Sequence, residues 1–199
     1  MSTENPRIGV FGGTFDPVHV GHLVAAVNVR HALALDCVLL VVANQPWQKM
    51  GGRTLTPADQ RFYVVAAAVE GLAGLEASRL EIERGGVSYT ADTLAEVARL
   101  HPGAELTLVI GADVARDLDS WERVDEVRRM ASLAVVNRPG ATVPTLLPGW
   151  RADVVEIPNL EVSSTDLRAR AVDGRPLDFL VPSAAIHAMR RLGLYAGGG

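Results

Sequence analysis

Short apolar segments alternate with amphipathic ones along this chain, and no other feature of the sequence constrains the fold as strongly. Runs rich in aliphatic and β-branched residues recur at 8–11, 37–42, 75–82, 106–110, 133–136 and 154–157. Between them, residues 23–34, 57–69 and 90–100 carry apolar side chains at helical spacing. Strands that are apolar on nearly every residue and alternate with helices are typical of a mostly parallel sheet covered on both faces. The sequence therefore predicts an α/β fold, a Rossmann-like three-layer sandwich.

Length and charge narrow the kind of protein further. The 199 residues are expected to form one domain, 1–199, with a C-terminal helical part at about 163–195 packed on it. The formal net charge is -4, with Lys and Arg spread along the chain, which argues against polymeric nucleic acid as a partner. The apolar runs are too short and too often broken by charge to span a bilayer, so we expect a cytoplasmic protein with no membrane partner. Whether the chain forms a homo-oligomer stays open.

The segment directly after the first expected strand holds the most chemical information. Residues 12–22 read Gly-Gly-Thr-Phe-Asp-Pro-Val-His-Val-Gly-His. The paired glycines are expected to let the backbone turn sharply and bring N–H groups to an anion, which the start of the following helix also favours. His19 and His22 are expected to share one face of the helix start, and Gly21 removes a side chain where a nucleotide could press on the backbone. The segment predicts a phosphate site with two histidine donors.

Other interpretations of this segment are weaker. It lacks the Gly-Lys-Ser/Thr ending of a Walker loop and the Gly-x-Gly-x-x-Gly of a dinucleotide site. Asp16 followed by Pro17 is also an ordinary helix-start signal, and a lone histidine is more often a surface residue than a ligand. Metal binding by the two histidines is less favoured, because no third His, Cys or nearby Glu completes a set of ligands. The complete string after a strand favours the phosphate site.

A second candidate anion site lies near the other end of the chain. In residues 162–168, Ser and Thr hydroxyls precede a helical run that contains Arg168. Backbone N–H groups at a helix start, these hydroxyls and the guanidinium could all bind one polyphosphate. The alternative is a simple capping box from Ser163 to Asp166, with Arg168 on the surface.

The two segments together resemble the signature motifs of the nucleotidyltransferase superfamily, specifically the bacterial nicotinate-nucleotide adenylyltransferases. Residues 174–182 and 193–195 also look like these enzymes, so the resemblance covers nearly the whole chain. It implies transfer of AMP from ATP to nicotinic acid mononucleotide, with Mg²⁺ carried by the ATP phosphates rather than by a dedicated protein site. Two alternatives remain: an adenylyltransferase for another acceptor, such as nicotinamide mononucleotide or phosphopantetheine, and a nucleotide sensor that has lost catalysis.

The resemblance also assigns roles to individual residues. In this family the two histidines contact the ATP phosphates and stabilise the charge that grows during transfer, so the expected catalytic residues are His19, His22 and Lys49. The expected ATP-binding residues are Gly12, Gly13, Thr14, Phe15, Gly21, Asp113, Arg138, Ser163, Ser164, Thr165 and Arg168. The expected mononucleotide-binding residues are Asp16, Thr90 and Trp121.

Several of these assignments carry their own alternatives. Many relatives have Pro-Pro-His-Lys in the segment that ends at Lys49, whereas this chain has Trp47 and Gln48 before the matching lysine. A contact made by that histidine is therefore not carried over. Thr90 is expected to cap a helix and leave N–H groups facing a carboxylate. Trp121 is expected to stack on the pyridine ring, with a core tryptophan as the alternative. Arg61 matches an arginine of the family, with a helix-surface position as the alternative.

Overall fold

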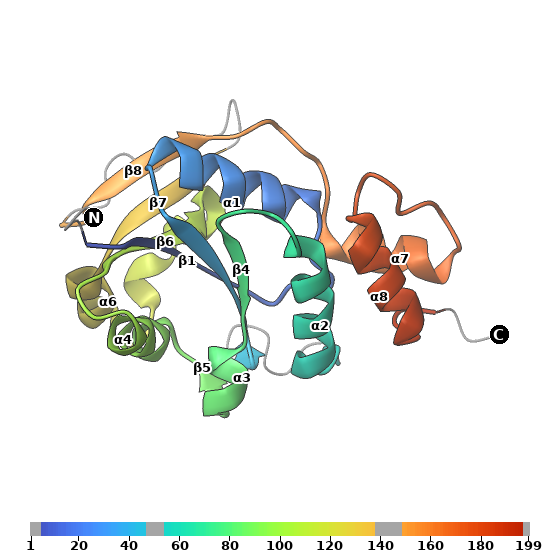
Figure 1. Ribbon diagram of the computed structural model, residues 1–199, viewed down its shortest axis with the longest axis horizontal. Coiled ribbons are helices and arrows are strands. Elements are labelled where there is room, and N and C mark those ends of the chain that lie inside the picture. Colours follow the sequence, from blue (N-terminus) through green and yellow to red (C-terminus); the bar gives the residue numbers. More distant parts are fainter. Residues whose placement is uncertain (1–4, 47–53, 138–148, 197–199) are drawn as a thin grey trace.

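The computed structural model describes residues 5–46, 54–137 and 149–196 and contains a central parallel sheet (Figure 1). Its strands are β1 (Arg7–Gly13), β2 (Cys37–Val42), β4 (Leu75–Ser78), β6 (Glu105–Gly111), β7 (Ala131–Asn137) and β8 (Ala152–Glu156). They lie in the order β4-β2-β1-β6-β7-β8, and each neighbouring pair is parallel. The predicted Rossmann-like α/β fold is confirmed.

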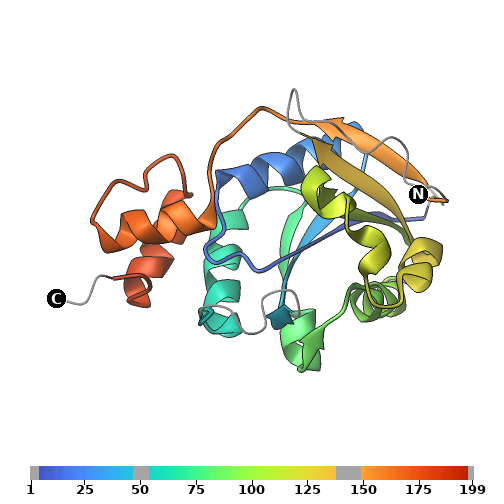
Figure 2. The same cartoon turned by 180° about the vertical axis from the view of Figure 1, so that it is seen from behind.

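Helices cover both faces of this sheet, as the views in Figures 1 and 2 show. The helices that pack against one face are α1 (Val20–Ala32) and α2 (Ala58–Val69). The helices on the other face are α3 (Leu80–Arg84), α4 (Thr90–Leu100), α5 (Ala112–Ala115) and α6 (Val124–Met130). The remaining elements are β3 (Gln45–Pro46), β5 (Val87–Ser88), the 3₁₀ helix η2 (Leu118–Ser120), α7 (Ser164–Val172) and α8 (Ser183–Arg191).

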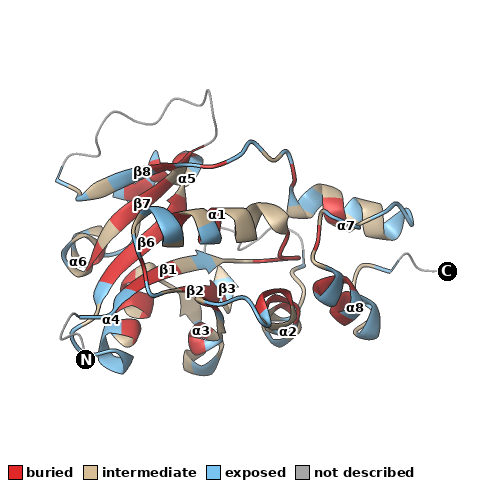
Figure 3. Cartoon of the chain, turned by 45° about the horizontal axis from the view of Figure 1, so that its top comes forward, coloured by how far each residue is buried: buried red, intermediate tan, exposed pale blue. Residues whose placement is uncertain are grey.

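The alternating side chains of β2 show how one apolar run holds three layers together. Val38, Leu40 and Val42 are each 0 % exposed and belong to the core beneath α1 and α2. Leu39 and Val41 point the other way, into the core beneath α4. Fully burying one Val or Leu side chain contributes about 1.5–3 kcal/mol, so the strand anchors both helical layers. Buried residues accordingly concentrate in the sheet in Figure 3.

One expected strand is shorter than its sequence suggested. The run 75–82 pairs with β2 only as far as Ser78, and α3 follows it. The physical reason is local: Leu80–Arg84 consists mostly of good helix formers, and the helix ends at Gly85 with a φ of 72°, a left-handed value that suits glycine. The prediction of a strand through residue 82 is therefore wrong.

The two C-terminal helices lie beside the sandwich rather than on the sheet (Figures 1 and 2). Helix α8 packs against α2 through a face that includes Ile186 and Met189, which are 4 % and 2 % exposed. The backbone N–H of Val20, at the start of α1, donates to the carbonyl of Leu180 at 3.0 Å. These contacts bring the second candidate anion site next to the first.

Candidate active site

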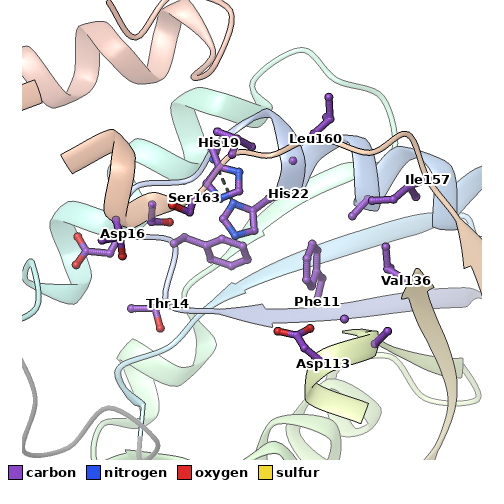
Figure 4. Close-up of a pocket in the computed structure, with 18 of the residues that line it drawn as sticks. Phe11, Thr14, Asp16, His19, His22, Asp113, Val136, Ile157, Leu160 and Ser163 are labelled. Carbon is purple, nitrogen blue, oxygen red and sulfur yellow. Dashed lines mark hydrogen bonds between the residues drawn. The ribbon is translucent and has the colours of Figure 1, made fainter. Parts of the chain in front are cut away.

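A cavity of about 810 Å³ lies at the carboxyl ends of β1, β6 and β7. The strand order reverses between β1 and β6, because β2 and β4 lie to one side and β7 and β8 to the other. Ligands of open α/β sheets bind at such a point. Among the expected site residues, those that line this cavity are Thr14, Phe15, Asp16, His19, Gly21, His22, Asp113, Ser163, Ser164, Thr165 and Arg168. Several of them are labelled in Figure 4.

The two histidines form a stacked pair on the wall of this cavity (Figure 4). Their ring centroids are 3.7 Å apart with an interplanar angle of 28°, which confirms that they share one face of the helix start. The backbone N–H of His19, the N-cap of α1, donates to Nδ1 of His22 at 3.2 Å. Because Nδ1 accepts, a neutral His22 ring carries its proton on Nε2 and can donate that proton to a phosphate oxygen.

The paired glycines do not make the turn expected of them. Gly12 and Gly13 continue β1, and the left-handed backbone conformation falls on Phe15, with a φ of 49°. A Cβ on Gly13 would lie 2.7 Å from the Phe15 ring, so the glycine leaves room for that ring to fold back. Phe15 is 2 % exposed and packs edge-on against His22, with ring centroids 5.0 Å apart. Phe15 thus packs directly against one member of the histidine pair.

Gly21 has a comparable steric role. A Cβ at this position would lie 3.1 Å from Nδ1 of His19 and 3.1 Å from Cγ1 of Val162. Any larger residue would therefore press on the histidine and on the segment that leads into α7. The expected close approach of a nucleotide to the Gly21 backbone stays a prediction.

Arg61 is a buried structural residue, and its alternative position on the helix surface is wrong. Its side chain is 1 % exposed. The guanidinium donates to the carbonyl oxygens of Thr14 at 2.7 Å, Ala43 at 2.7 Å, Thr56 at 2.8 Å and Asn44 at 3.3 Å. These contacts tie the segments that follow β1 and β2 to the start of α2. The sequence could not predict this role, because the acceptors are main-chain carbonyls, which every residue type has.

The second motif both caps a helix and lines the cavity. Ser163 is the N-cap of α7, and its hydroxyl accepts from the backbone N–H of Asp166 at 3.2 Å, as the capping interpretation predicts. Arg168, however, lines the cavity instead of lying on the surface. The two interpretations of the motif are therefore compatible, except for the surface position of the arginine.

Direct hydrogen bonds join the two motifs. The Ser164 hydroxyl donates to the carbonyl of Pro17 at 2.9 Å. One terminal nitrogen of Arg168 donates to the carbonyl of Asp16 at 2.7 Å, and the other donates to Oγ1 of Thr165 at 3.1 Å. Contacts within the protein thus hold the cationic group beside the histidine segment.

Residues at and after the carboxyl end of β6 form another part of the wall of the larger cavity. Asp113 is exposed, and its Oδ1 lies 2.5 Å from where a Cβ of Gly111 would be, so the side chain folds back over the strand end. Arg116, one turn later along the chain, also lines the cavity. Its spacing of three residues from Asp113 was the available sequence signal, although the family motif does not include it.

A second, smaller cavity of about 210 Å³ adjoins the first and shares Phe11 and Thr14 with it. Thr90 and Trp121 both line this smaller cavity. Indole Nε1 of Trp121 is buried and has no hydrogen-bond partner among the residues that the structure describes. Glu81, which sequence reasoning missed, also lines it.

Thr90 is the first residue of α4 rather than its cap, so the prediction that it caps the helix is wrong. Tyr89 is the N-cap and makes no side-chain capping bond. The N–H groups of the first turn of a helix have no partner within that helix, and here the turn faces the smaller cavity. A carboxylate can therefore still be favoured at this helix start, because these N–H groups do not depend on a threonine cap.

Five expected site residues are placed differently or cannot be compared. Gly12 and Gly13, expected to bind ATP, line the smaller cavity. Asp16, expected to bind the mononucleotide, lines the larger cavity together with the histidines. Lys49 and Arg138 lie outside the described residues, as does Trp47.

A histidine pair and a hydroxyl–arginine motif, joined over the switch point of a parallel sheet, define a nucleotide-binding protein of the nucleotidyltransferase class. Residues 10–170 match the family model described as cytidylyltransferase-like. The chain is 40% identical to the probable nicotinate-nucleotide adenylyltransferase of Corynebacterium kroppenstedtii, with 100% of this chain and 95% of that protein covered. It is 42% identical to that of Saccharopolyspora erythraea, with 96% and 90% covered. The chain belongs to the cytidylyltransferase-like family and, within it, to the nicotinate-nucleotide adenylyltransferases.

Solved structures support the fold independently of sequence. The nicotinic acid mononucleotide adenylyltransferase of Plasmodium falciparum, complexed with NaAD, is similar with a TM-score of 0.77. The match covers 96% of this chain and 98% of the other at 17% sequence identity. The arrangement of sheet and helices is therefore shared where most side chains differ.

Proposed function

We propose that this chain transfers AMP from ATP to nicotinic acid mononucleotide, giving nicotinic acid adenine dinucleotide and pyrophosphate in NAD biosynthesis. The observation that carries the proposal is the pair of adjoining cavities at the switch point, of about 810 Å³ and 210 Å³, which share Phe11 and Thr14. Two substrates in separate cavities with a common wall can bring their reacting phosphates together. The names of the relatives agree with this activity.

In the proposed reaction, ATP occupies the larger cavity and the mononucleotide the smaller one. A 5′-phosphate oxygen of the mononucleotide attacks the α-phosphorus of ATP in line and forms a new P–O bond, while the bond to the β-phosphate breaks and pyrophosphate leaves. Such a transfer requires positioning and charge stabilisation rather than a nucleophilic side chain. The stacked His19 and His22 line the larger cavity and would donate to the developing charge. Ser164, Thr165 and Arg168 would hold the β- and γ-phosphates, and Lys49 would add charge.

Family membership implies a divalent metal ion with ATP, and we propose Mg²⁺. Among the described residues, no group of three or more His, Cys, Asp or Glu side chains is arranged to hold a metal ion. Mg²⁺ prefers six oxygen ligands and keeps several waters, so ATP phosphates and water can supply its ligands. The ion would therefore arrive with ATP and neutralise phosphate charge.

Replacing Arg168 with alanine is expected to raise the KM for ATP about tenfold or more, with a smaller fall in kcat, because a charge-assisted contact to the triphosphate is lost. Arg170→Ala is the matched control, since Arg170 lies on the same helix but forms an ion pair with Asp166 at 2.6 Å. Steady-state kinetics with each substrate varied in turn measure both constants. A rise in the KM for the mononucleotide alone would place Arg168 with the other substrate.

The enzyme is expected to prefer nicotinic acid mononucleotide to its amide by at least about tenfold in kcat/KM. Thr90 and Thr93, in the first turn of α4, line the smaller cavity. The N–H groups of a helix start favour a carboxylate, whereas an amide NH₂ would present a donor to these donors. Pyrophosphate release with ATP and either mononucleotide, or with phosphopantetheine, measures the preference. Equal use of the amide contradicts nicotinate selectivity, and release with none of the three acceptors indicates a nucleotide sensor instead.

We further propose that residues 1–199 act as one catalytic unit in the cytoplasm. Support for a single unit comes from α7, which brings Ser164 and Arg168 to a cavity that the ends of the sheet strands, α1 and α5 also line. Within the described ranges, no helix combines the length and hydropathy needed to cross a membrane.

A further inference from the structure

Tyr195, close to the C-terminus, contacts the histidine segment at the other end of the chain. Its hydroxyl donates to Oδ1 of Asp16 at 2.5 Å, across 179 positions of sequence. The hydroxyl in turn accepts from Oγ1 of Thr56 at 3.3 Å. Tyr195 lines neither substrate cavity. A contact of this kind acts on the site through another residue.

The chemistry of this contact suits a permanent hydrogen bond. Asp16 is 2 % exposed, and a buried carboxylate needs hydrogen-bond donors to offset the loss of water. Burial of Tyr195, and next its hydrogen bond to Asp16, raise the pKa of the phenol well above its usual range. The hydroxyl therefore keeps its proton and stays a donor at any pH at which the protein would be assayed.

Other anchors of the same segment bind its main chain. Arg61 holds the carbonyl of Thr14, Arg168 holds that of Asp16, and Ser164 holds that of Pro17. The Tyr195 bond differs, because it holds the side chain of Asp16 from the opposite end of the sequence. Asp16 precedes His19 by only three residues, so its side-chain anchor lies close along the chain to the histidine pair.

We propose that Tyr195 is a positioning residue, which orients His19 and His22 for nucleotidyl transfer by holding the Asp16 side chain. The proposal rests on the proposed function for its kinetic consequence but not for the contact itself. Small displacements of a catalytic group cost large factors in rate, and a shift of about 1 Å can cost a hundredfold. Asp16 also accepts from Arg168 through its main-chain carbonyl, so the residue that Tyr195 holds contacts both phosphate motifs.

The test removes one oxygen atom. In Tyr195→Phe we expect kcat to fall about tenfold, while the KM for the mononucleotide changes less than about twofold, because Asp16 does not line the smaller cavity. Tyr63→Phe is the matched control: Tyr63 lies on α2 beneath Arg191 and outside both cavities, and both constants should stay unchanged. Equal losses in kcat and in mononucleotide binding would indicate general damage and overturn the proposal.

A double-mutant cycle and one measurement without turnover complete the test. In an Asp16→Ala background, Tyr195→Phe should change kcat less than about twofold, because its partner is already gone; a full tenfold loss there overturns the proposal. Amide hydrogen exchange in residues 14–22 should speed up in Tyr195→Phe and stay unchanged in Tyr63→Phe. Unchanged exchange in Tyr195→Phe refutes the positioning role. Absence of pyrophosphate release by the wild-type protein refutes only the proposed function, so the two failures are distinguishable.

Discussion

Replacing His22 with alanine is expected to lower kcat by about a hundredfold or more, the usual loss when one donor to the transition state is removed. His22 stacks on His19 and accepts a backbone N–H at Nδ1, which leaves Nε2 as the donor nitrogen of the neutral ring. Pyrophosphate release at saturating ATP, Mg²⁺ and nicotinic acid mononucleotide measures the effect.

The control for this variant lies on the same helix. His31 is exposed in the last turn of α1, away from both cavities, and His31→Ala should keep the wild-type rate. Circular dichroism should show both variants folded. Near wild-type activity of His22→Ala would remove the histidine from the catalytic role and leave only a packing role against Phe15.

Replacing Arg61 with leucine is expected to lower the free energy of unfolding by about 3 kcal/mol or more. The change removes the donor from the buried carbonyl oxygen of Ala43 and from the part-buried carbonyl oxygens of Thr14 and Thr56. Each buried acceptor left without a donor costs about 1–3 kcal/mol. For a chain of this length, the corresponding fall in Tm is about 6–12 °C. Urea unfolding and calorimetry measure both quantities.

Arg99→Leu provides the comparison, because Arg99 is exposed in the last turn of α4. Surface substitutions usually change stability by no more than about 0.5 kcal/mol. If Arg61→Leu and Arg99→Leu had equally small effects, the buried guanidinium would not hold the segments after β1 and β2 together.

Much of the architecture could be read from periodicity. Runs such as Cys37–Val42 are apolar at every position, which is the pattern of a strand covered on both faces, and the structure places β2 inside the parallel sheet. The spacing of His19 and His22 likewise predicted their shared face. The run at 75–82 failed because its second half consists of good helix formers, so its composition no longer distinguished strand from helix.

The candidate site was harder to predict from the sequence wherever a side chain contacts main-chain atoms or where the backbone conformation matters. The turn assigned to Gly12 and Gly13 falls on Phe15, because a ring folds over Gly13 and the glycine is needed for space rather than for its backbone freedom. The helix start at Thr90 needs no threonine cap to present its N–H groups. A motif shows which residue types occur at which spacing. It does not show whether a residue is needed for its backbone conformation, for its small size or for a contact that it makes.

The sequence by itself determined the alternation of strands and helices along most of the chain, the placing of the site after the strands, and the family, because apolar periodicity and motif chemistry are local properties of the chain. How the segments of the site come together was decided only by the tertiary structure. The contact of Tyr195 with Asp16, the carbonyls gathered around Arg61 and the meeting of α7 with the histidine segment all link positions far apart in sequence. Such contacts arise only when the packing of α8 against α2 and of both helical layers against the sheet brings those positions together, since hydrogen bonds act over about 3 Å whatever the separation along the chain.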